Sequence, residues 1–230
     1  MHGIAIPFIE RFRREIKFLR PLAYYPLVDN VSDAEINIAP GHEGSNDATI
    51  TGATPNQDGQ VGPAYSFDGI DDEITHAVTD DFSPTNDISV VVIFKLGADG
   101  VDNASSQPLV VAKYWKIHVR TTNNLVQWRF DNAGAVVAAH TLGNGDRNWH
   151  IGVGTYDNSD GSNSVMKIYI DGVIRQTTNA AKLASTTYIQ SIGKISPVFF
   201  NGYIQHVALF DKVLTEDEVL RLAQYADLAD

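Results

Sequence analysis

Hydrophobic and polar positions alternate in short runs along most of the chain. From residue 22 onward, runs rich in Val, Ile, Tyr, Phe and Trp are separated by Asn, Asp and Gly. This arrangement favours packed antiparallel sheets over alternating β–α–β units. The predicted strands are Ala23–Val28, Pro63–Phe67, Ile88–Leu96, Leu109–Val119, Leu125–Phe130, Ala135–His140, Trp149–Tyr156, Val165–Ile170 and Tyr203–Phe210. Asp171-Gly172 lies between two such runs and predicts a type I′ hairpin turn.

The pattern near the start of the chain is helical instead. Pro7 suits a first helical turn and Pro21 would end the helix, so we expect a helix over residues 7–20. We interpret residues 1–21 as an amphipathic arm outside the main domain, which then spans residues 22–230. The apolar positions recur at spacings of three and four, and we expect them to form an assembly surface: Phe8, Phe12, Ile16 and Leu19.

One further helix is predicted near the end of the chain. Thr215 is a suitable N-cap, and Glu218 follows three residues later as its capping-box partner. Val219, Leu222 and Ala223 form the apolar stripe of this helix. The predicted fold is therefore all-β, a two-sheet antiparallel sandwich with a short helical arm at one end and a short helix at the other.

Composition narrows the function classes. The chain has 230 residues, 17 Lys and Arg, 28 Asp and Glu, no Cys and a formal charge of −11. The negative charge argues against nucleic-acid binding. The absence of Cys excludes disulfides, thiolate metal sites and a cysteine nucleophile. No run approaches the roughly 18 apolar residues of a membrane-spanning helix. Charges from Glu10 onward interrupt the first apolar run, so we expect no signal peptide and synthesis in a host cytoplasm.

Two neighbouring strands are predicted to present a polar face. Alternation places Trp115 on one side of its strand and Trp128 on one side of the next, both directed to the core. Trp149 shares a strand face with Ile151 and Val153, so we expect it to anchor the core too. The opposite faces would form a basic groove if the two strands pair. Its candidate glycan-binding residues are Tyr114, Lys116, His118, Arg120, Gln127 and Arg129. An ordinary solvated sheet face is the alternative.

Six segments carry a family resemblance. In order, they are YYPLVDN, SNDATITGA, AYSFDGIDDEI, NWHIGVGTYD, KIYIDGVI and FNGYIQHVALFDKVLTEDEV. Together they resemble the laminin-G-like jelly rolls of the concanavalin A-like lectin/glucanase superfamily over about residues 22–226. The resemblance implies a jelly roll with one convex and one concave sheet, and ligands taken on the concave side or its rim. The resemblance predicts the fold better than the function, because this superfamily includes lectins, adhesion modules, glycosidases and structural domains.

The resemblance also implies a calcium ion near the start of the domain. Calcium prefers oxygen ligands from loops. Gln205 and His206 stand where relatives commonly have an acidic pair, which weakens or removes one ligand position. Turn formation and surface solvation are the alternative roles for these side chains. The candidate metal ligands are Asp29, Asn30, Asp33, Asn46 and Asp68, with Asp71 and Asp72 as further oxygen donors.

Catalysis is not expected. A retaining glycosidase places two carboxylates about 5 Å apart across the sugar bond. The compact acidic cluster here is Glu216-Asp217-Glu218, at the start of the predicted helix, where acidic residues stabilise the helix dipole. The histidines form no metalloprotease pair, and the chain has no nucleophile elbow.

Two functions from different classes remain. The first is a non-catalytic lectin-like structural or attachment subunit of a larger particle, in particular a bacteriophage virion (head decoration, tail or fibre). The arm would dock it there, and we expect a homo-oligomer, with a trimer as the simplest bundle. Such a subunit would contact surface glycans. The alternative is a free carbohydrate-binding or adhesion module. A third role, for the basic arm alone, is contact with an anionic lipid surface.

Overall fold

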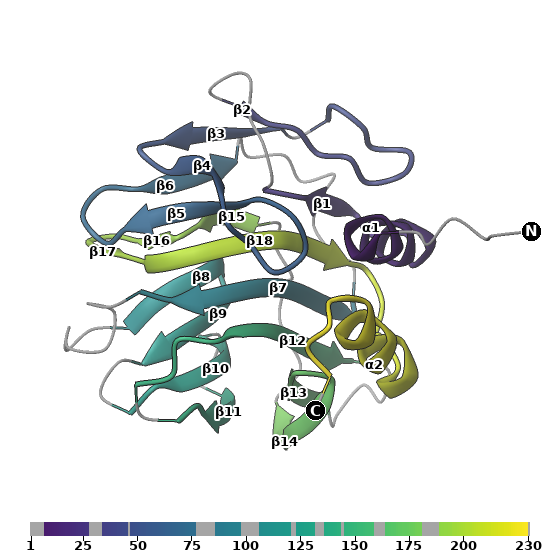
Figure 1. The fold of residues 1–230 in the computed structure, drawn as a ribbon. Coiled ribbons are helices and arrows are strands. Elements are labelled where there is room, and N and C mark those ends of the chain that lie inside the picture. Colours follow the sequence, from purple (N-terminus) through teal and green to yellow (C-terminus); the bar gives the residue numbers. More distant parts are fainter. Residues whose placement is uncertain are drawn as a thin grey trace, which may run out of the picture.

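The protein is a sandwich of two antiparallel sheets with a helix near each end of the chain (Figure 1). The computed structural model describes residues 7–27, 34–45, 47–76, 86–97, 106–120, 123–131, 136–143, 145–158, 164–180 and 189–229. The predicted all-β jelly-roll sandwich with two short helices is confirmed. None of the helices within these ranges is long and apolar enough to cross a membrane.

The first sheet, sheet A, is built around two long strands. Its order is β14–β13–β12–β7–β18–β5–β4, and β1 pairs with the end of β18. The strands are β1 (Ala23–Tyr25), β4 (Thr54–Gln57), β5 (Ala64–Asp68), β7 (Ile88–Leu96), β12 (Trp149–Asp157), β13 (Ser164–Ile170), β14 (Val173–Ala180) and β18 (Asn201–Phe210). The turn between β13 and β14 has positive φ angles at Asp171 (56°) and Gly172 (81°), as the predicted hairpin requires.

The second sheet, sheet B, has the order β11–β10–β9–β8–β15–β6–β3–β2. Its strands are β2 (Ala34–Glu35), β3 (Ala48–Thr51), β6 (Glu73–His76), β8 (Ser106–Ala112), β9 (Trp115–Arg120), β10 (Leu125–Phe130), β11 (Val136–Thr141) and β15 (Ile189–Ile192). β16 (Lys194–Ile195) and β17 (Val198–Phe199) form a separate small hairpin. The single strand predicted over Leu109–Val119 is wrong, because the chain turns at Lys113 and Tyr114 and divides it into β8 and β9.

The main core lies between the two sheets. Trp115 and Trp128 are both buried there, as predicted. Trp128 packs against Gly154 of the opposing sheet, where a Cβ would lie 2.5 Å from the indole ring. Its Nε1 donates to the carbonyl oxygen of Thr155 at 3.0 Å, so the indole is satisfied as well as packed.

A second core covers part of the outer face of sheet A. Helices α1 (Phe8–Phe18) and α2 (Glu216–Tyr225) pack there against alternate residues of the central strands. Val91 and Ile93 of β7 and Ile151 and Val153 of β12 point into this layer. Strand β7 is therefore buried on both faces, which explains why its sequence is a nearly continuous apolar run.

The position of α1 corrects the prediction of a free arm. Phe12, Ile16 and Leu19 are buried in the second core, and the Phe12 ring lies 4.9 Å from that of His206 on β18. Only Phe8 of the predicted assembly residues is exposed. An apolar stripe in the sequence predicts which face of a helix is buried, but it does not identify the surface that covers this face. Here the covering surface belongs to the same chain, so residues 8–19 are part of the sandwich and not a separate arm.

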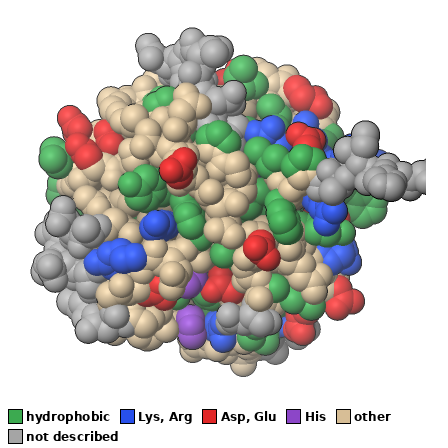
Figure 2. Space-filling view, in the orientation of Figure 1, with side chains coloured by type: hydrophobic (Ala, Val, Ile, Leu, Met, Phe, Trp, Pro, Cys, Tyr) green, Lys and Arg blue, Asp and Glu red, His purple; other side chains and the backbone are tan. Residues whose placement is uncertain are grey.

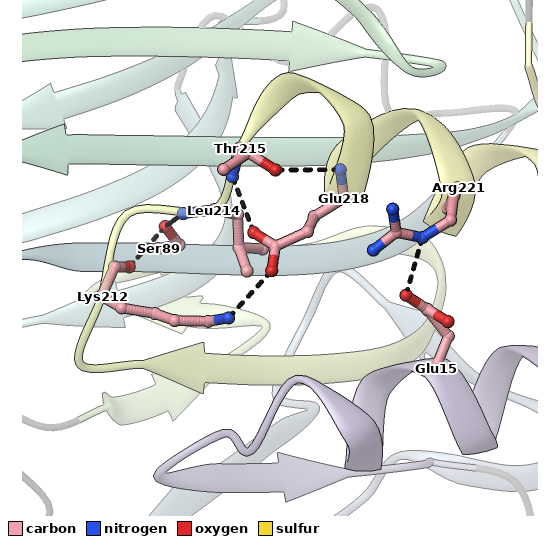
Figure 3. Close-up of polar contacts among 7 residues, drawn as sticks. All are labelled: Glu15, Ser89, Lys212, Leu214, Thr215, Glu218 and Arg221. Atoms are coloured by element: carbon pink, nitrogen blue, oxygen red, sulfur yellow. Dashed lines mark hydrogen bonds and ion pairs between the residues drawn. The ribbon is translucent and has the colours of Figure 1, made fainter.

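Helix α2 begins as predicted (Figure 3). Thr215 Oγ1 accepts from the Glu218 amide at 3.2 Å, and the Glu218 carboxylate accepts from the Thr215 amide at 2.8 Å. Ser89 Oγ on β7 accepts from the Leu214 amide at 2.9 Å, which ties the loop before α2 to sheet A. Hydrogen bonds at both the cap and the preceding loop therefore fix where α2 lies.

Candidate functional site

The predicted polar face forms on sheet B. Strands β9 and β10 pair so that Lys116 lies opposite Arg129 and His118 lies opposite Gln127. Arg120 is exposed at the end of β9. Tyr114 lies in the preceding turn, with Lys113 Nζ 5.0 Å from its ring centroid. The structure thus brings together the central four of the six predicted residues.

Two of these four are held by one carboxylate. Lys116 Nζ donates to Asp131 at 2.7 Å, and Arg129 Nε donates to the other oxygen of Asp131 at 2.5 Å. Partial burial raises the pKa of Asp131, but the hydrogen bonds and charges of Lys116 and Arg129 outweigh it and leave the pKa below its ordinary value. The face is therefore less basic than the sequence implied.

The other two, His118 and Gln127, are buried and hydrogen-bonded to each other. His118 is 2 % exposed, and its Nε2 lies 2.8 Å from Gln127 Oε1. Burial lowers the pKa of His118 to about 4, assisted by the charges of Lys116 and Arg129. The ring is therefore neutral at pH 7. All four central residues thus use polar groups in contacts within the domain.

A pocket of about 370 Å³ lies at the edge of sheet A, away from this face. Strand β5 ends there and β18 begins there, with Asn201 paired opposite Asp68. Asn201 Nδ2 donates to the Asp68 carbonyl oxygen at 2.9 Å. The lining residues are Gly52, Thr54, Ser66, Phe67, Asp68, Asp72, Gly97, Asn201, Gly202 and Tyr203.

Two glycines leave room for the polar side chains of the pocket. A Cβ on Gly52 would lie 2.1 Å from Asp72 Oδ1, and the φ angle of +77° at Gly52 also disfavours other residues. A Cβ on Gly97 would lie 1.8 Å from Asn201 Oδ1. The positions of the carboxylate and the amide therefore depend on glycines that are remote in sequence.

Aromatic rings continue the pocket along the outer face of sheet A. Tyr203 on β18 lies opposite Lys95 on β7, and Lys95 lies opposite Trp149 on β12. The ring centroids of Tyr203 and Trp149 are 6.1 Å apart, and Lys95 Nζ is 5.8 Å from the Tyr203 centroid. The core role predicted for Trp149 is confirmed in part. Trp149 packs against the second core, as Ile151 and Val153 do, but its own side chain is only half-buried.

Three carboxylates gather beside the pocket. Oxygen atoms of Asp68, Asp71 and Asp72 all lie within 4.8 Å of one another. Burial raises the pKa of Asp72, and the charges of Asp68 and Asp71 raise it further, although the Asp68 amide donates to Asp72 Oδ2 at 2.8 Å. A divalent cation would relieve this repulsion, and oxygen ligands of this kind suit calcium. The cluster therefore fits the calcium ion that the resemblance implies.

Four of the predicted calcium ligands lie outside the described residues: Asp29, Asn30, Asp33 and Asn46. The described members of the predicted set are Asp68, Asp71 and Asp72, and of these Asp68 and Asp72 lie in the pocket wall. The pocket residues Asn201 and Tyr203 were missed by sequence reasoning. Alternation along β18 indicates which face Tyr203 occupies, but only the pairing of distant strands brings it near Asp68 and Trp149.

Comparisons with known proteins agree with this architecture. The family model Laminin_G_3, described as the concanavalin A-like lectin/glucanases superfamily, matches residues 68–220. Among curated proteins, none matches the sequence. The binding domain of botulinum neurotoxin serotype D is 13 % identical, with a TM-score of 0.67 over 91 % of this chain and 52 % of that chain. The serotype D/C VPI 5993 binding domain is 12 % identical, with a TM-score of 0.70 over 90 % and 52 %.

A third similar structure contains a sugar. It is the serotype D ligand binding domain in complex with N-acetylneuraminic acid, 14 % identical, with a TM-score of 0.68 over 93 % of this chain and 52 % of that chain. The present chain spans about half the length of these structures, and at such low identity the likeness is one of fold. The family model matches more than half of the chain and includes the polar face of sheet B and part of the pocket. The protein therefore belongs to the concanavalin A-like lectin/glucanase superfamily.

Proposed function

We propose that the protein is a non-catalytic, lectin-like attachment module that binds a glycan in the pocket between β5 and β18. The observation that carries the proposal is the composition of this pocket of about 370 Å³, which combines carboxylates, an amide and a tyrosine at its rim. Binding pockets use a small number of placed polar groups for orientation and specificity. Carboxylates and amides offer acceptors and donors for sugar hydroxyl groups.

Each wall would have a distinct role in sugar binding. Asp68 and Asp72 would accept hydrogen bonds from hydroxyl groups, and Asn201 Oδ1 would accept another. The ring of Tyr203 would pack against the apolar C–H face of the sugar, with Trp149 extending this platform to a second residue of the glycan. The carboxylates would repel a carboxylated sugar, so we propose an uncharged glycan as the ligand.

The carboxylates are arranged less well for hydrolysis than for binding. Glycosidase carboxyl groups flank the scissile bond from two sides. Asp68 and Asp72 belong instead to one short loop, where Asp68 Oδ1 accepts from the Ile70 amide at 2.7 Å and Asp72 accepts from the Asp68 amide. Both carboxylates therefore approach the pocket from the same loop and would not flank a sugar bond, which supports a binding role.

A glycan array followed by calorimetry on the hits tests the proposal. We expect binding to uncharged glycans, loss of that binding in Tyr203→Ala, and no release of reducing sugar. Arg129→Ala on the sheet B face is the matched control and should bind as the wild type does. Silence across the array, or loss of binding in Arg129→Ala alone, would refute the pocket as the site. In the second case the sheet B face would be the glycan site.

A second proposed role is that of a structural or attachment subunit of a larger particle. It rested partly on an exposed apolar arm, and burial of Phe12, Ile16 and Leu19 removes that argument together with the one for a trimer. A lectin-like module still suits a particle that attaches to surface glycans, so a location in a bacteriophage virion stays a prediction. Mass spectrometry of virions purified from the host that synthesises the protein tests this location: the protein should be present in the virions, and its absence from them would contradict the prediction.

A further inference from the structure

Helix α1 presents a second surface that glycan binding does not use. On the side away from the second core, it carries a row of cations with a phenylalanine near each end. We call this surface the cationic strip; its members are Phe8, Arg11, Arg14, Lys17, Phe18 and the adjacent Arg20, all of them exposed. Figure 2 shows Lys and Arg side chains together with hydrophobic ones in the region of α1.

The strip differs in charge from the rest of the molecule. Residues 1–20 contain five cations and two anions, whereas the whole chain has a charge of −11. One of those anions is engaged elsewhere, because Glu15 accepts from Arg221 Nε of α2 at 3.0 Å (Figure 3). Within the described part of the chain, Arg11 and Arg14 have no ion-pair partner. A positive surface is thus concentrated on one helix of an acidic protein.

The strip is also unusually apolar for a solvent-facing surface. Phe18 is 76 % exposed and Phe8 is 50 % exposed. The two are ten positions apart, which corresponds to about 15 Å along a helix. Nothing in the second core requires phenylalanine at these positions, because Phe12, Ile16 and Leu19 already fill that contact. An apolar environment beside the helix would remove both rings from water.

A groove runs between α1 and α2 along the strip. It has a volume of about 380 Å³ and is lined by Arg11, Arg14, Glu15, Phe18 and Tyr225. Arg11, Arg14 and Phe18 follow the spacing i, i+3, i+7 and therefore share one side of the helix. Guanidinium groups form paired hydrogen bonds with phosphate, so two arginines here suit phosphate-bearing groups.

We propose that the cationic strip binds the surface of an anionic lipid membrane, with α1 lying parallel to it. Helices that lie in the interface combine Lys and Arg with Phe, Trp or Leu that enter the acyl boundary. The strip has both components, and the exposed rings distinguish a lipid surface from a purely acidic protein partner. The acidic remainder of the molecule is repelled by the same membrane, which orients the protein with α1 toward the lipid.

Vesicle sedimentation with the full chain tests the proposal. We expect binding to vesicles of phosphatidylcholine mixed with phosphatidylserine, little binding to phosphatidylcholine alone, and weakening as salt increases. Arg11→Gln/Arg14→Gln should bind about thirtyfold more weakly, because each basic residue near an anionic membrane contributes about 1 kcal/mol. Phe18→Ser should weaken binding without changing its salt dependence.

The control removes the same charge from another part of the molecule. Lys167 and Lys194 lie outside α1 and pair with Glu216 and Glu73. Lys167→Gln/Lys194→Gln should therefore bind vesicles as the wild type does. Equal weakening in this variant, or equal binding to both kinds of vesicle, would overturn the proposal. A third result would also overturn it: the wild type binds no vesicles but associates with itself, and Arg11→Gln/Arg14→Gln abolishes this self-association. The strip would then contact a second copy of the chain.

Discussion

Replacing Phe12 with alanine tests whether α1 is part of the folded core. Phe12 is fully buried between the helix layer and β18, in contact with the ring of His206. Removing a buried phenylalanine side chain loses its transfer free energy, about 1.5–3 kcal/mol. The cavity left behind raises the total loss to about 3–5 kcal/mol. For a domain of this size we expect the melting temperature to fall by about 10 °C.

The same helix supplies a matched control. Phe18→Ala removes the same side chain from a position that is 76 % exposed, so its effect on stability should stay within about 0.5 kcal/mol. Urea unfolding of both variants, followed by tryptophan fluorescence, gives the two free energies. Light scattering at each protein concentration reports the oligomeric state.

Equal stability of Phe12→Ala and Phe18→Ala would refute the reasoning. Equal stability is what a separate oligomerisation arm would produce. In that case Phe12→Ala would dissociate an oligomer, and the free energy of unfolding of the sandwich would not change. Deletion of residues 1–20 extends the test, because it would remove the side chains of Phe12, Ile16 and Leu19 from the second core and uncover His206 on β18. We expect that deletion to cause aggregation and not to release a stable monomer.

Three further predictions concern packing, pH and metal binding. Gly154→Ala should destabilise the protein by at least about 1–3 kcal/mol in urea unfolding, because the added Cβ would lie 2.5 Å from the Trp128 ring; wild-type stability would contradict that packing. Burial lowers the pKa of His206 to about 3, so the unfolded chain takes up a proton below about pH 6.5 that the folded chain does not. The contribution of His206 to the free energy of unfolding should therefore be complete above about pH 6.5 and decrease as the pH falls toward the pKa of about 3 in the folded protein. NMR should find the ring still neutral at about pH 5, and a protonated ring at that pH would contradict this prediction. Calcium should raise the melting temperature of the wild type but not of Asp71→Asn, whose side chain is exposed; equal shifts would exclude this cluster as the calcium site.

The sequence alone was sufficient to predict the features that depend on residues close together along the chain. The Thr215 and Glu218 capping box and the turn at Asp171-Gly172 formed as predicted, because each depends on residues within a few positions of one another. Alternation along β9 and β10 also assigned Trp115 and Trp128 to the core correctly. On β9 and β10 the face that carries the tryptophans is otherwise apolar and the opposite face is mostly polar, so alternation alone distinguishes the core-facing side.

Only the tertiary structure determined what meets each face. The apolar stripe of α1 was visible in the sequence, but the surface that covers it belongs to the second core, where Phe12 meets His206 on the distant strand β18. The same outer face of sheet A buries Ile151 under the helices and leaves Trp149 half-exposed, a distinction that depends on where the helices end and not on alternation. The candidate pocket joins Gly52, Asp68 and Asn201, positions that only strand pairing brings together. Sequence periodicity thus determined which residues turn inward, whereas long-range pairing and helix docking decided which outward-facing residues remain available for a ligand.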